Sequence, residues 1–316
     1  YYGNLQYYQN TGSATNPQFA APVENPFGLT EVNVIAFPTL ADLDDDGDMD
    51  LLVGDGTGVM KYFQNTGTST NPQFAPAQLN PFGLNSTNVF SVTSFVDLDD
   101  DGDMDLMVGQ YGGSMQYFRN NGTPAAPQFG APQLNPFGIT SMVDLASPTF
   151  ADLDNDGDLD MLVGEYYGNM QYFENTGTAT NPQFAAKQQN PFGLTEVIDA
   201  AFPAFADLDS DGDMDLLIGE YGGNMQYYTN TTSVGTQEEL TNIHLNLFPN
   251  PVANVLTIQT DTPFETMEAF DALGKLVGQY DGSRTNILVS NWESGVYVLK
   301  FTDAQGRYTT RRLLKE

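Results

Sequence analysis

Short apolar runs separated by turn residues recur along residues 1–231 and determine the secondary structure that we expect. Four of these runs end in glycine, the first being Leu-Leu-Val-Gly at residues 51–54. Each is followed by a glycine-containing turn and by a segment of alternating polar and apolar side chains, such as Met-Gln-Tyr-Phe at residues 115–118. Alternation with a period of two is typical of β-strands, and no stretch shows helical periodicity. The pattern predicts an all-β chain.

The predicted strands recur with a period of 55 residues. Each repeat holds roughly four short strands, separated by Asn-Thr-Gly or Asn-Asn-Gly, Pro-Gln-Phe and Asn-Pro-Phe-Gly segments. Such a unit is typical of a propeller blade, a small twisted sheet that buries its faces against its neighbours. We therefore predict a multi-blade β-propeller built from four 55-residue repeats plus a partial blade.

The ends of the repeat region leave the number of blades open. Residues 1–8 match residues 166–173, so the chain enters in the middle of a blade, and the last copy stops after residues 225–228. Five copies of the Gln/Lys-Tyr-aromatic strand thus accompany four acidic loops. N-terminal strands could complete the last blade and close a ring, or the segment could belong to a larger ring.

Aromatic pairs and Asn-Pro-Phe-Gly segments recur along the repeats, and each predicts a structural role. Aromatic pairs occur at residues 7–8, 62–63, 117–118, 172–173 and 227–228. Because strand side chains alternate between faces, one member of each pair is expected to pack between blades, with sugar stacking as the alternative. The Asn-Pro-Phe-Gly segments are expected to be turns.

An acidic nonapeptide follows the first predicted strand of each repeat. Asp42 opens Asp-Leu-Asp-Asp-Asp-Gly-Asp-Met-Asp, and the four copies hold 22 of the 41 acidic residues. Carboxylates this crowded repel each other unless a cation lies among them. Calcium takes six to eight oxygen ligands in a flexible cage, so we predict about four calcium ions, one in each loop. A solvated acidic turn is the alternative for a single loop, but four copies in register disfavour it. The candidate metal-binding residues are Asp42, Asp44, Asp46, Asp48, Asp50, Asp97, Asp99, Asp101, Asp103, Asp105, Asp152, Asp154, Asp156, Asp158, Asp160, Asp207, Asp209, Asp211, Asp213 and Asp215.

Alternate side chains of each loop are expected to converge on its inside. Gly47 allows a positive-φ bend, and the following residue, Asp48, can offer its carbonyl oxygen. An EF-hand would need flanking helices and a glutamate at position twelve, where this chain has Val53. Asp50 at position nine is therefore expected to supply the closing carboxylate, and Met49 and its equivalents are expected to anchor the core.

Charge and composition restrict the partners. The formal charge is −31, and residues 1–231 carry 31 acidic residues against three basic ones, whereas residues 232–316 carry 10 against seven. This shift predicts a domain boundary near residue 231. The negative charge excludes nucleic acid and anionic membranes as favoured partners. There is no cysteine, and no apolar run is long enough to span a membrane. The chain begins Tyr-Tyr-Gly without methionine, so we expect a removed leader or a start inside a longer precursor.

The C-terminal region has a different pattern. Residues 232–242 are polar and predict a linker. Residues 243–316 alternate apolar and polar side chains in short runs separated by glycine and aspartate turns, which predicts a small Ig-like β-sandwich.

The repeat region resembles a known family. The segment from Phe205 through Gly219, followed by residues 225–228, is similar to VCBS-type repeats of bacterial surface propellers, which are related to the FG-GAP repeats of integrin alpha subunits. In that family the Asp-x-Asp-x-Asp-Gly-x-x-Asp loop binds calcium through positions one, three, five and nine and the carbonyl of position seven. The resemblance covers residues 1–231 and implies a calcium-binding propeller that acts as an adhesion or binding scaffold with an unspecified target.

Residues 243–316 resemble a second family. Leu-Phe-Pro-Asn-Pro at 247–251, Asp-Ala-Leu-Gly-Lys at 271–275, Ser-Gly-Val-Tyr at 294–297 and the basic segment 311–315 are similar to the type A C-terminal sorting domain of the type IX secretion system of Bacteroidota. This implies that the type IX secretion machinery recognises residues 243–316 and exports the chain to the outer surface of a Gram-negative cell. A generic Ig-like accessory module is the alternative.

We therefore expect a secreted or cell-surface binding module whose ligand is a surface protein or a glycan. A calcium-dependent lectin is the alternative, and a polysaccharide-degrading enzyme is less favoured because residues 1–231 contain no histidine. Differences between repeats concentrate in residues 29–36, 84–92 and 139–146. Partner contacts are expected there, at Glu31, Asn33, Asn85, Asn88 and Ser141.

Overall fold

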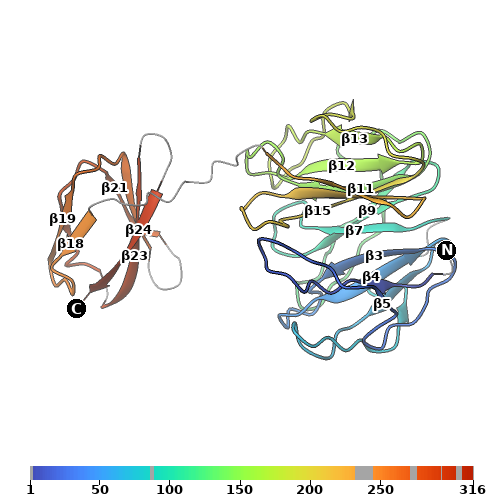
Figure 1. Ribbon diagram of the computed structural model, residues 1–316, viewed down its shortest axis with the longest axis horizontal. Coiled ribbons are helices and arrows are strands. Elements are labelled where there is room, and N and C mark those ends of the chain that lie inside the picture. Colours follow the sequence, from blue (N-terminus) through green and yellow to red (C-terminus); the bar gives the residue numbers. More distant parts are fainter. Residues whose placement is uncertain are drawn as a thin grey trace. The chain divides into compact units, whose positions relative to one another are not determined.

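The structure is a computed structural model that describes residues 3–85, 89–231, 245–270, 276–292, 294–303 and 308–315. In this part of the chain every regular element is a strand, and neighbouring strands run antiparallel. The chain divides into two compact units, Tyr1–Thr231 and Thr232–Glu316 (Figure 1). The predicted linker, residues 232–242, lies outside the described residues. Across those described ranges there is no helix of the length and hydrophobicity needed to cross a membrane.

Three complete four-stranded sheets form most of the first unit, and each is built from consecutive strands of one repeat. The first sheet contains β3 (Ala36–Ala41), β4 (Asp50–Asp55), β5 (Met60–Phe63) and β6 (Gln78–Leu79). The second sheet contains β7 (Val92–Val96), β8 (Asp105–Gly109), β9 (Met115–Phe118) and β10 (Gln133–Leu134). The third sheet contains β11 (Ala146–Ala151), β12 (Asp160–Glu165), β13 (Met170–Phe173) and β14 (Gln188–Gln189).

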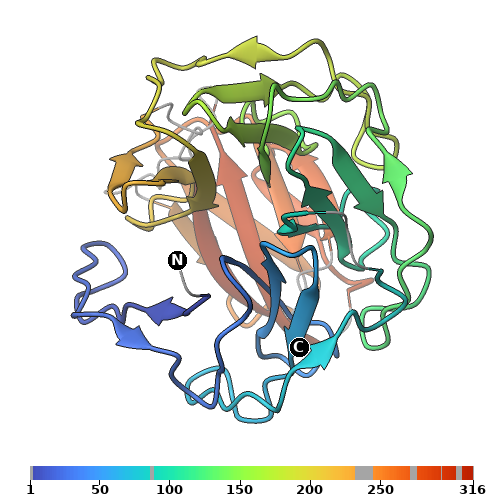
Figure 2. The ribbon, with the colours of Figure 1, turned by 90° about the vertical axis from the view of Figure 1, so that its right-hand side faces the viewer.

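Two incomplete sheets flank these three. The N-terminal ribbon pairs β1 (Gln6–Tyr7) with β2 (Val23–Glu24), the counterparts of the third and fourth strands of a repeat. The fourth sheet contains β15 (Ala201–Ala206), β16 (Asp215–Glu220) and β17 (Met225–Tyr228), the first three strands of a repeat. The sheets follow one another around the first unit (Figure 2). No strand pairing joins the fourth sheet to the ribbon in the described chain, so the sheets do not make a closed propeller.

The glycine at the end of the second strand shows how closely successive sheets approach. A Cβ atom at Gly54 would lie 1.8 Å from the carbonyl oxygen of Ser91, at the entry to the second sheet. Equivalent approaches of 2.0 and 2.2 Å to the next sheet occur at Gly109 and Gly164. At Gly219 the nearest atom lies 3.8 Å away and belongs to its own sheet. Three tight junctions therefore join the four sheets, and no described residue of another sheet approaches Gly219 as closely.

The first strands of the four repeats meet at the centre of the first unit. Phe37, Val92, Leu145 and Ala200 form one buried cluster with one member from each repeat. The rings of Phe37 and Phe202 lie 5.6 Å apart, so the first and fourth repeats touch here. The repeats are therefore held together centrally although their outer strands are incomplete.

The aromatic pairs of the complete sheets are buried more fully than the sequence predicts, since only one member of each pair was expected between blades. In the three complete sheets both members of each pair are at most 4% exposed, because each sheet is covered on both faces. Only the incomplete sheets expose them, at Tyr7, Tyr8 and Tyr227.

The expectation that Met49 and its equivalents anchor the core is wrong for the methionines. Met49, Met104 and Met214 are 56%, 40% and 47% exposed, because the acidic loops extend beyond the edges of the sheets. Leu159 alone packs against a buried cluster.

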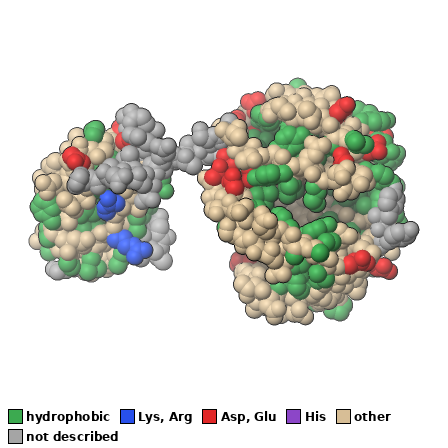
Figure 3. Space-filling model, in the orientation of Figure 1, with side chains coloured by type: hydrophobic (Ala, Val, Ile, Leu, Met, Phe, Trp, Pro, Cys, Tyr) green, Lys and Arg blue, Asp and Glu red, His purple; other side chains and the backbone are tan. Residues whose placement is uncertain are grey.

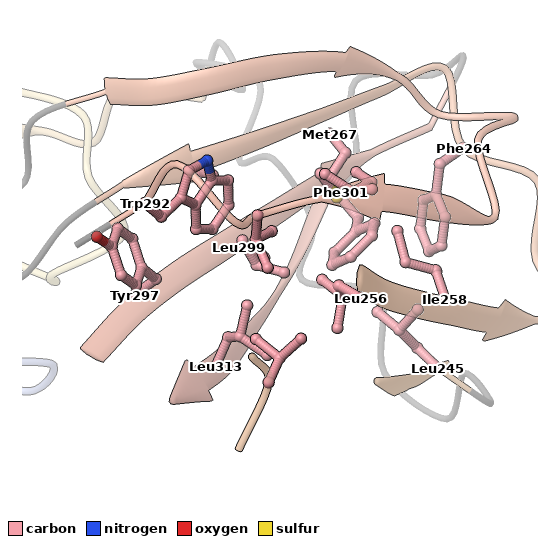
Figure 4. Close-up of a cluster of buried hydrophobic side chains, with 14 residues drawn as sticks. Leu245, Leu256, Ile258, Phe264, Met267, Trp292, Tyr297, Leu299, Phe301 and Leu313 are labelled. Carbon is pink, nitrogen blue, oxygen red and sulfur yellow. The ribbon is translucent and has the colours of Figure 1, made fainter. Parts of the chain in front are cut away.

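The second unit consists of two antiparallel sheets that share one hydrophobic core. One sheet contains β18 (Leu245–Phe248), β19 (Val255–Thr260) and β22 (Asn286–Leu288). The other contains β20 (Thr266–Phe270), β21 (Leu276–Asp281), β23 (Gly295–Thr302) and β24 (Tyr308–Lys315). Leu256 and Ile258 from the first sheet lie in one buried cluster with Leu299 and Phe301 from the second (Figure 4). The motif at residues 271–275 lies outside the described residues.

Candidate metal centres

The first acidic loop joins β3 to β4 and folds around the carboxylate of Asp42. The Asp42 Oδ1 atom accepts a hydrogen bond from the Asp46 backbone N–H (3.2 Å), and Oδ2 accepts one from the Gly47 N–H (2.9 Å). The Asp46 Oδ1 atom accepts a hydrogen bond from the Asp48 N–H (3.1 Å). Gly47 has a φ of +91°, as expected, and Asp45 has a φ of +57°, which the sequence did not indicate. The second and third loops repeat these bonds.

Carboxylates at positions one, three and five converge in every loop. In each loop one oxygen atom from each of the three side chains lies within 4.8 Å of the other two. The sets are Asp42, Asp44 and Asp46; Asp97, Asp99 and Asp101; Asp152, Asp154 and Asp156; and Asp207, Asp209 and Asp211. The structure thus brings together three of the five predicted positions of each loop as a cluster of carboxylate oxygens.

Position seven contributes a buried carboxylate, whereas the sequence led us to expect only its carbonyl as a ligand. Among the described residues, the Oδ1 atoms of Asp48, Asp103, Asp158 and Asp213 are buried and have no hydrogen-bond partner. Burial raises the pKa of the Asp48 carboxyl, and the nearby negative charges of the same loop raise it further. The position-three Oδ1 atoms of three loops are also buried without a partner. A carboxylate oxygen buried in this way is destabilising unless a cation compensates it.

Position nine is occupied by a hydrogen-bonded carboxylate in the core. The Asp50 Oδ2 atom accepts hydrogen bonds from the Tyr62 hydroxyl (2.6 Å) and the Leu43 N–H (3.4 Å), and Oδ1 accepts one from the Asn65 N–H (2.7 Å). A carboxylate has about four lone-pair sites, so this arrangement leaves one at Oδ1 for a cation. Equivalent tyrosine and backbone donors bind Asp105, Asp160 and Asp215. Any closing ligand supplied by position nine is thus limited to one oxygen while these bonds persist.

Burial also changes the acidity of position nine. Desolvation raises the pKa of the Asp105 and Asp160 carboxyls to about 6, although hydrogen bonds from tyrosine and backbone donors partly oppose the shift. The charged form of these residues is therefore less favoured in the metal-free fold than in an exposed aspartate.

A basic side chain from beyond β9 contacts the second acidic loop. The Arg119 Nε atom lies 2.7 Å from the Asp99 Oδ2 atom, and Nη2 lies 3.1 Å from the Asp101 Oδ2 atom. The first loop has Gln64 at the corresponding position, with its amide 2.6 Å from the Asp44 Oδ2 atom. Arg119 therefore partly neutralises a cluster that stays fully negative in the first loop.

The donor set selects the class of ion that could bind. Each cluster offers carboxylate oxygens and no nitrogen or sulfur ligand, which suits a hard cation such as calcium and does not suit a structural zinc ion. On the face of the molecule drawn in Figure 3, the visible Lys and Arg side chains lie on the second unit, whereas the first unit shows Asp and Glu. The residues present therefore fit calcium.

Comparison with protein families identifies both regions. The FG-GAP-like repeat matches residues 42–108, 97–163 and 152–218, which together cover more than half of the chain. The chain belongs to the FG-GAP-like repeat family. The secretion system C-terminal sorting domain matches residues 246–316, so both predicted resemblances are confirmed. This sorting domain indicates export by the type IX secretion system to the cell surface or the extracellular space.

Similarity to individual proteins is low. No curated protein matches this FG-GAP-like chain. Among solved structures, PorZ of Porphyromonas gingivalis, a surface component of the type IX secretion system, is 14% identical over 93% of this chain and 40% of that one, with a TM-score of 0.32. The Tc holotoxin pore of Photorhabdus luminescens is 12% identical over 98% and 17%, with a TM-score of 0.37. Sqt1 from Chaetomium thermophilum is 13% identical over 92% and 72%, with a TM-score of 0.32. The chain thus spans less than half of the first two structures, and similarities this weak do not establish a shared function.

The Asn-Pro-Phe-Gly segments of these FG-GAP-like repeats do more than turn the chain. The Asn135 Oδ1 atom accepts a hydrogen bond from the Met115 N–H (2.8 Å), and the Asn135 N–H donates to the Met115 carbonyl (2.8 Å). The ring of Phe137 packs against Tyr117 with centroids 5.1 Å apart. The same contacts recur at Asn25, Asn80 and Asn190. The segment therefore fastens the fourth strand to the third, a role that its fourfold recurrence could have signalled.

The FG-GAP-like repeats expose apolar side chains at the end opposite the acidic loops. In an antiparallel sheet, successive connections lie at alternate ends of the sheet. The turns that follow the second strands, β4, β8, β12 and β16, therefore lie at the same end as the segments that precede the first strand of each sheet. We call this surface the apolar end; its exposed members are Val34, Val89, Val143, Ile198, Tyr111, Tyr166, Tyr167 and Tyr221. The Phe90 and Tyr111 rings stack there with centroids 5.6 Å apart. Exposed apolar groups gathered at one end are typical of binding surfaces.

Proposed function

We propose that this protein is a calcium-stabilised binding module displayed on the outer surface of a Gram-negative, Bacteroidota-like cell. In this proposal residues 1–231 act as a propeller-type scaffold that holds about four calcium ions and has no catalytic role. Residues 243–316 act as an Ig-like sorting domain that engages the type IX secretion machinery. The ligand, a surface protein or a glycan, binds at the apolar end.

The observation that carries the calcium assignment is the pair of buried, unpartnered carboxylate oxygens at positions three and seven of the first, second and fourth loops. Within the described residues, each of these loops also brings carboxylate oxygens from positions one, three and five within 4.8 Å of one another. A single divalent cation would neutralise this charge and supply the partner that the buried oxygens lack. When bound, calcium would supply charge neutralisation and cross-linking of the loop, and the aspartates would hold it.

The apolar end supports the binding role. The segments that differ most between repeats, residues 29–36, 84–92 and 139–146, all lead into a first strand at this end. Glu31, Asn33, Asn85 and Ser141 are exposed there, whereas Asn88 lies outside the described residues. Variable side chains presented on a repeated scaffold suit recognition of one specific partner.

A lectin is the second candidate, and the exposed tyrosines favour it. Tyr111, Tyr166, Tyr167 and Tyr221 occupy the turns after the second strands and are 41–58% exposed. Flat aromatic rings that combine an apolar face with a hydroxyl group suit stacking on sugar rings.

Calorimetric titration of the full chain with calcium, after removal of bound metal, tests the proposal. We expect about four equivalents to bind and the melting temperature to rise on binding. A flat titration together with an unchanged melting temperature would contradict calcium binding. A glycan array and a screen of surface proteins, each run with wild type and with the combined Glu31→Ala, Asn33→Ala and Ser141→Ala variant, then separate lectin from adhesin. Binding that survives these substitutions would exclude the apolar end as the binding surface.

A further inference from the structure

The residue that follows the third strand of each repeat lies beside the acidic loop of the same repeat. These residues are Gln64, Arg119, Glu174 and Thr229, spaced 55 residues apart. In the three complete sheets, the carbonyl of this residue accepts a hydrogen bond of 2.8 Å from a backbone N–H of the connection to the fourth strand. In all four repeats, the N–H of the next residue, an asparagine, donates to the position-nine aspartate of the loop. The backbone is thus fixed to the loop in the same way each time, and the side chain differs.

The side chain at this position reaches position three of the loop in the first two repeats. The Gln64 Nε2 atom lies 2.6 Å from the Asp44 Oδ2 atom, and the Arg119 Nε atom lies 2.7 Å from the Asp99 Oδ2 atom. Within the described chain, the Oδ1 atoms of both aspartates are buried and have no hydrogen-bond partner. An ion held by Oδ1 would therefore share its aspartate with Gln64 in the first loop and with Arg119 in the second.

The third repeat has a carboxylate at this position instead of a donor. An ionised Glu174 cannot donate a hydrogen bond to Asp154, which holds position three of the third loop. Asp154 is exposed, whereas Asp44 and Asp99 are partly buried. The Asp154 Oδ1 atom accepts a hydrogen bond from the Asp156 N–H (3.3 Å), a bond within its own loop. The orientation of the position-three carboxylate therefore follows the residue after the third strand.

The charge at this position differs among the four loops. Arg119 is positive, Gln64 and Thr229 are neutral, and Glu174 is negative. Burial and the aspartates of the third loop raise the pKa of the Tyr172 hydroxyl, and the nearby Glu174 carboxylate raises it further, so the charge of Glu174 acts at this loop. Position four also differs in charge between loops. Its side chain is exposed in every loop and lies outside the converging carboxylates, so water screens its charge more strongly.

We propose that the residue after the third strand sets the order in which the loops bind calcium, with the third loop filling first and the second loop last. This inference rests on the proposed calcium binding. A divalent ion is attracted by the Glu174 carboxylate and repelled by the Arg119 guanidinium group, and each unit of charge beside the site changes the affinity by about three-fold to ten-fold. The affinities of the third and second loops should therefore differ by about ten-fold to one-hundred-fold, with the first and fourth loops between them.

The order gives the protein a graded response to calcium. When the calcium concentration falls, the second loop empties first, and the ion pairs of Arg119 with Asp99 and Asp101 then reduce the repulsion among its carboxylates. The third loop, which has no such cation, keeps its ion longest.

An exchange of the two charged residues tests this order without changing the composition or the net charge. The combined Arg119→Glu and Glu174→Arg variant moves the carboxylate to the second loop and the guanidinium group to the third. Asp97→Asn and Asp152→Asn disable the second and the third loop, and each is made in wild type and in the exchanged protein. All full-length proteins are titrated with calcium against a chromophoric chelator, which resolves the individual affinities.

The matched control exchanges two exposed charges in the second unit, Arg284→Glu with Glu265→Arg. In wild type and in this control, we expect Asp97→Asn to abolish the weakest binding step and Asp152→Asn the tightest. In the exchanged protein the two assignments should be reversed. Four equal affinities, or an exchanged protein in which Asp97→Asn still abolishes the weakest step, would overturn the proposed order and leave calcium binding itself intact. Wild type that takes up no calcium would instead contradict the proposed function.

A milder variant keeps the test decisive if melting curves show that the exchanged protein is unfolded. Arg119→Gln combined with Glu174→Gln gives the second and third loops the residue that the first repeat has at Gln64. The four affinities should then lie within about three-fold of one another. A spread as wide as in wild type would overturn the proposal.

Discussion

The aspartates of one acidic loop have two separate tasks. Asp97 lies in the convergent cluster, whereas Asp105 is fully buried and accepts hydrogen bonds from the Tyr117 hydroxyl and the Asn120 N–H. Removing charge at the two positions should therefore have different consequences for metal affinity and for the fold.

We expect Asp97→Asn to remove about one of the bound calcium ions and to change the free energy of unfolding of the metal-free protein by less than about 1 kcal/mol, because the loss of an exposed acceptor for a backbone N–H is offset by weaker repulsion between the carboxylates. Asp105→Asn should lower that free energy by about 1–3 kcal/mol, because a buried hydrogen-bond network loses an acceptor. Calcium titration and urea unfolding in metal-free buffer measure the two effects. Equal losses of stability in both variants would show that the two positions share one role.

Position nine also determines how the metal-free protein responds to pH. The pKa of Asp105 and Asp160 is raised to about 6 in the fold, above the usual value of 3.8, so the folded state binds more protons than the unfolded state between these values. Their contribution to stability is therefore present below about pH 4 and is lost as pH rises through 6. Urea unfolding without metal should show higher stability at pH 4.5 than at pH 7. With calcium the trend should reverse, since protons compete with the ion for the carboxylates.

Arg119 should weaken the second calcium site. Its guanidinium group forms ion pairs with Asp99 and Asp101, and it would repel an incoming divalent ion. Arg119→Gln introduces the residue that the first repeat has at Gln64 and should raise calcium affinity at this loop by about three-fold to ten-fold. Arg284→Gln in the second unit is the control. Competition with a chromophoric chelator measures the change, and unaltered affinity would mean that Arg119 moves aside without cost.

At the scale of the elements, the close approach of successive sheets depends on glycine at the end of each second strand. A Cβ atom at Gly109 would lie 2.0 Å from the Ala146 carbonyl oxygen, whereas Gly219 has open space beside it. We expect Gly109→Ala to lower the free energy of unfolding by about 1–3 kcal/mol through overpacking. Gly219→Ala should change it by less than about 0.5 kcal/mol. Thermal unfolding in calcium compares them, and similar effects would mean that the sheets can separate without penalty.

The sequence predicted the strands and the loops but not every contact between them. Period-two alternation and the 55-residue repeat placed four strands in each repeat, and the complete sheets have four. Met49 was expected in the core because it is apolar, yet the loop that carries it extends past the edge of the sheet. The burial of an apolar side chain in a connection depends on how far that connection extends beyond the sheet. The periodicity of the sequence does not indicate that distance.

The candidate metal site was predicted in part. The spacing of Asp42, Asp44 and Asp46 correctly indicated side chains that converge. The hydrogen bonds from Tyr62 and Asn65 to Asp50 come from the following strand and the connection after it, and nothing in the loop itself signals them. Such contacts depend on how strands pair, which local spacing does not determine.

At the scale of the whole molecule, the two units have separate cores and differ in how much negative charge they carry. The second unit has its own buried cluster, and nearly all of the excess negative charge lies in the first. We expect deletion of residues 243–316 to leave the first unit folded, with a calcium-bound melting temperature within a few degrees of the full chain. The same deletion should prevent export, measured by surface proteolysis of cells. Normal surface levels of the truncated protein would contradict the sorting role.

The hydrogen bonds of Asp215 also determine how the first unit would resist a mechanical force. Tension that enters at the C-terminal boundary, Thr231, reaches β17 first, and β17 is held by β16 alone among the described strands. Pulled from its end, such a strand unzips one hydrogen bond at a time, which requires little force. The Asn230 N–H and the Tyr227 hydroxyl both bind the Asp215 carboxylate, at 3.0 and 2.8 Å. These bonds connect the last acidic loop to β17 and to Asn230 beyond it. An ion bound in that loop would therefore oppose the detachment of β17 from β16 under tension.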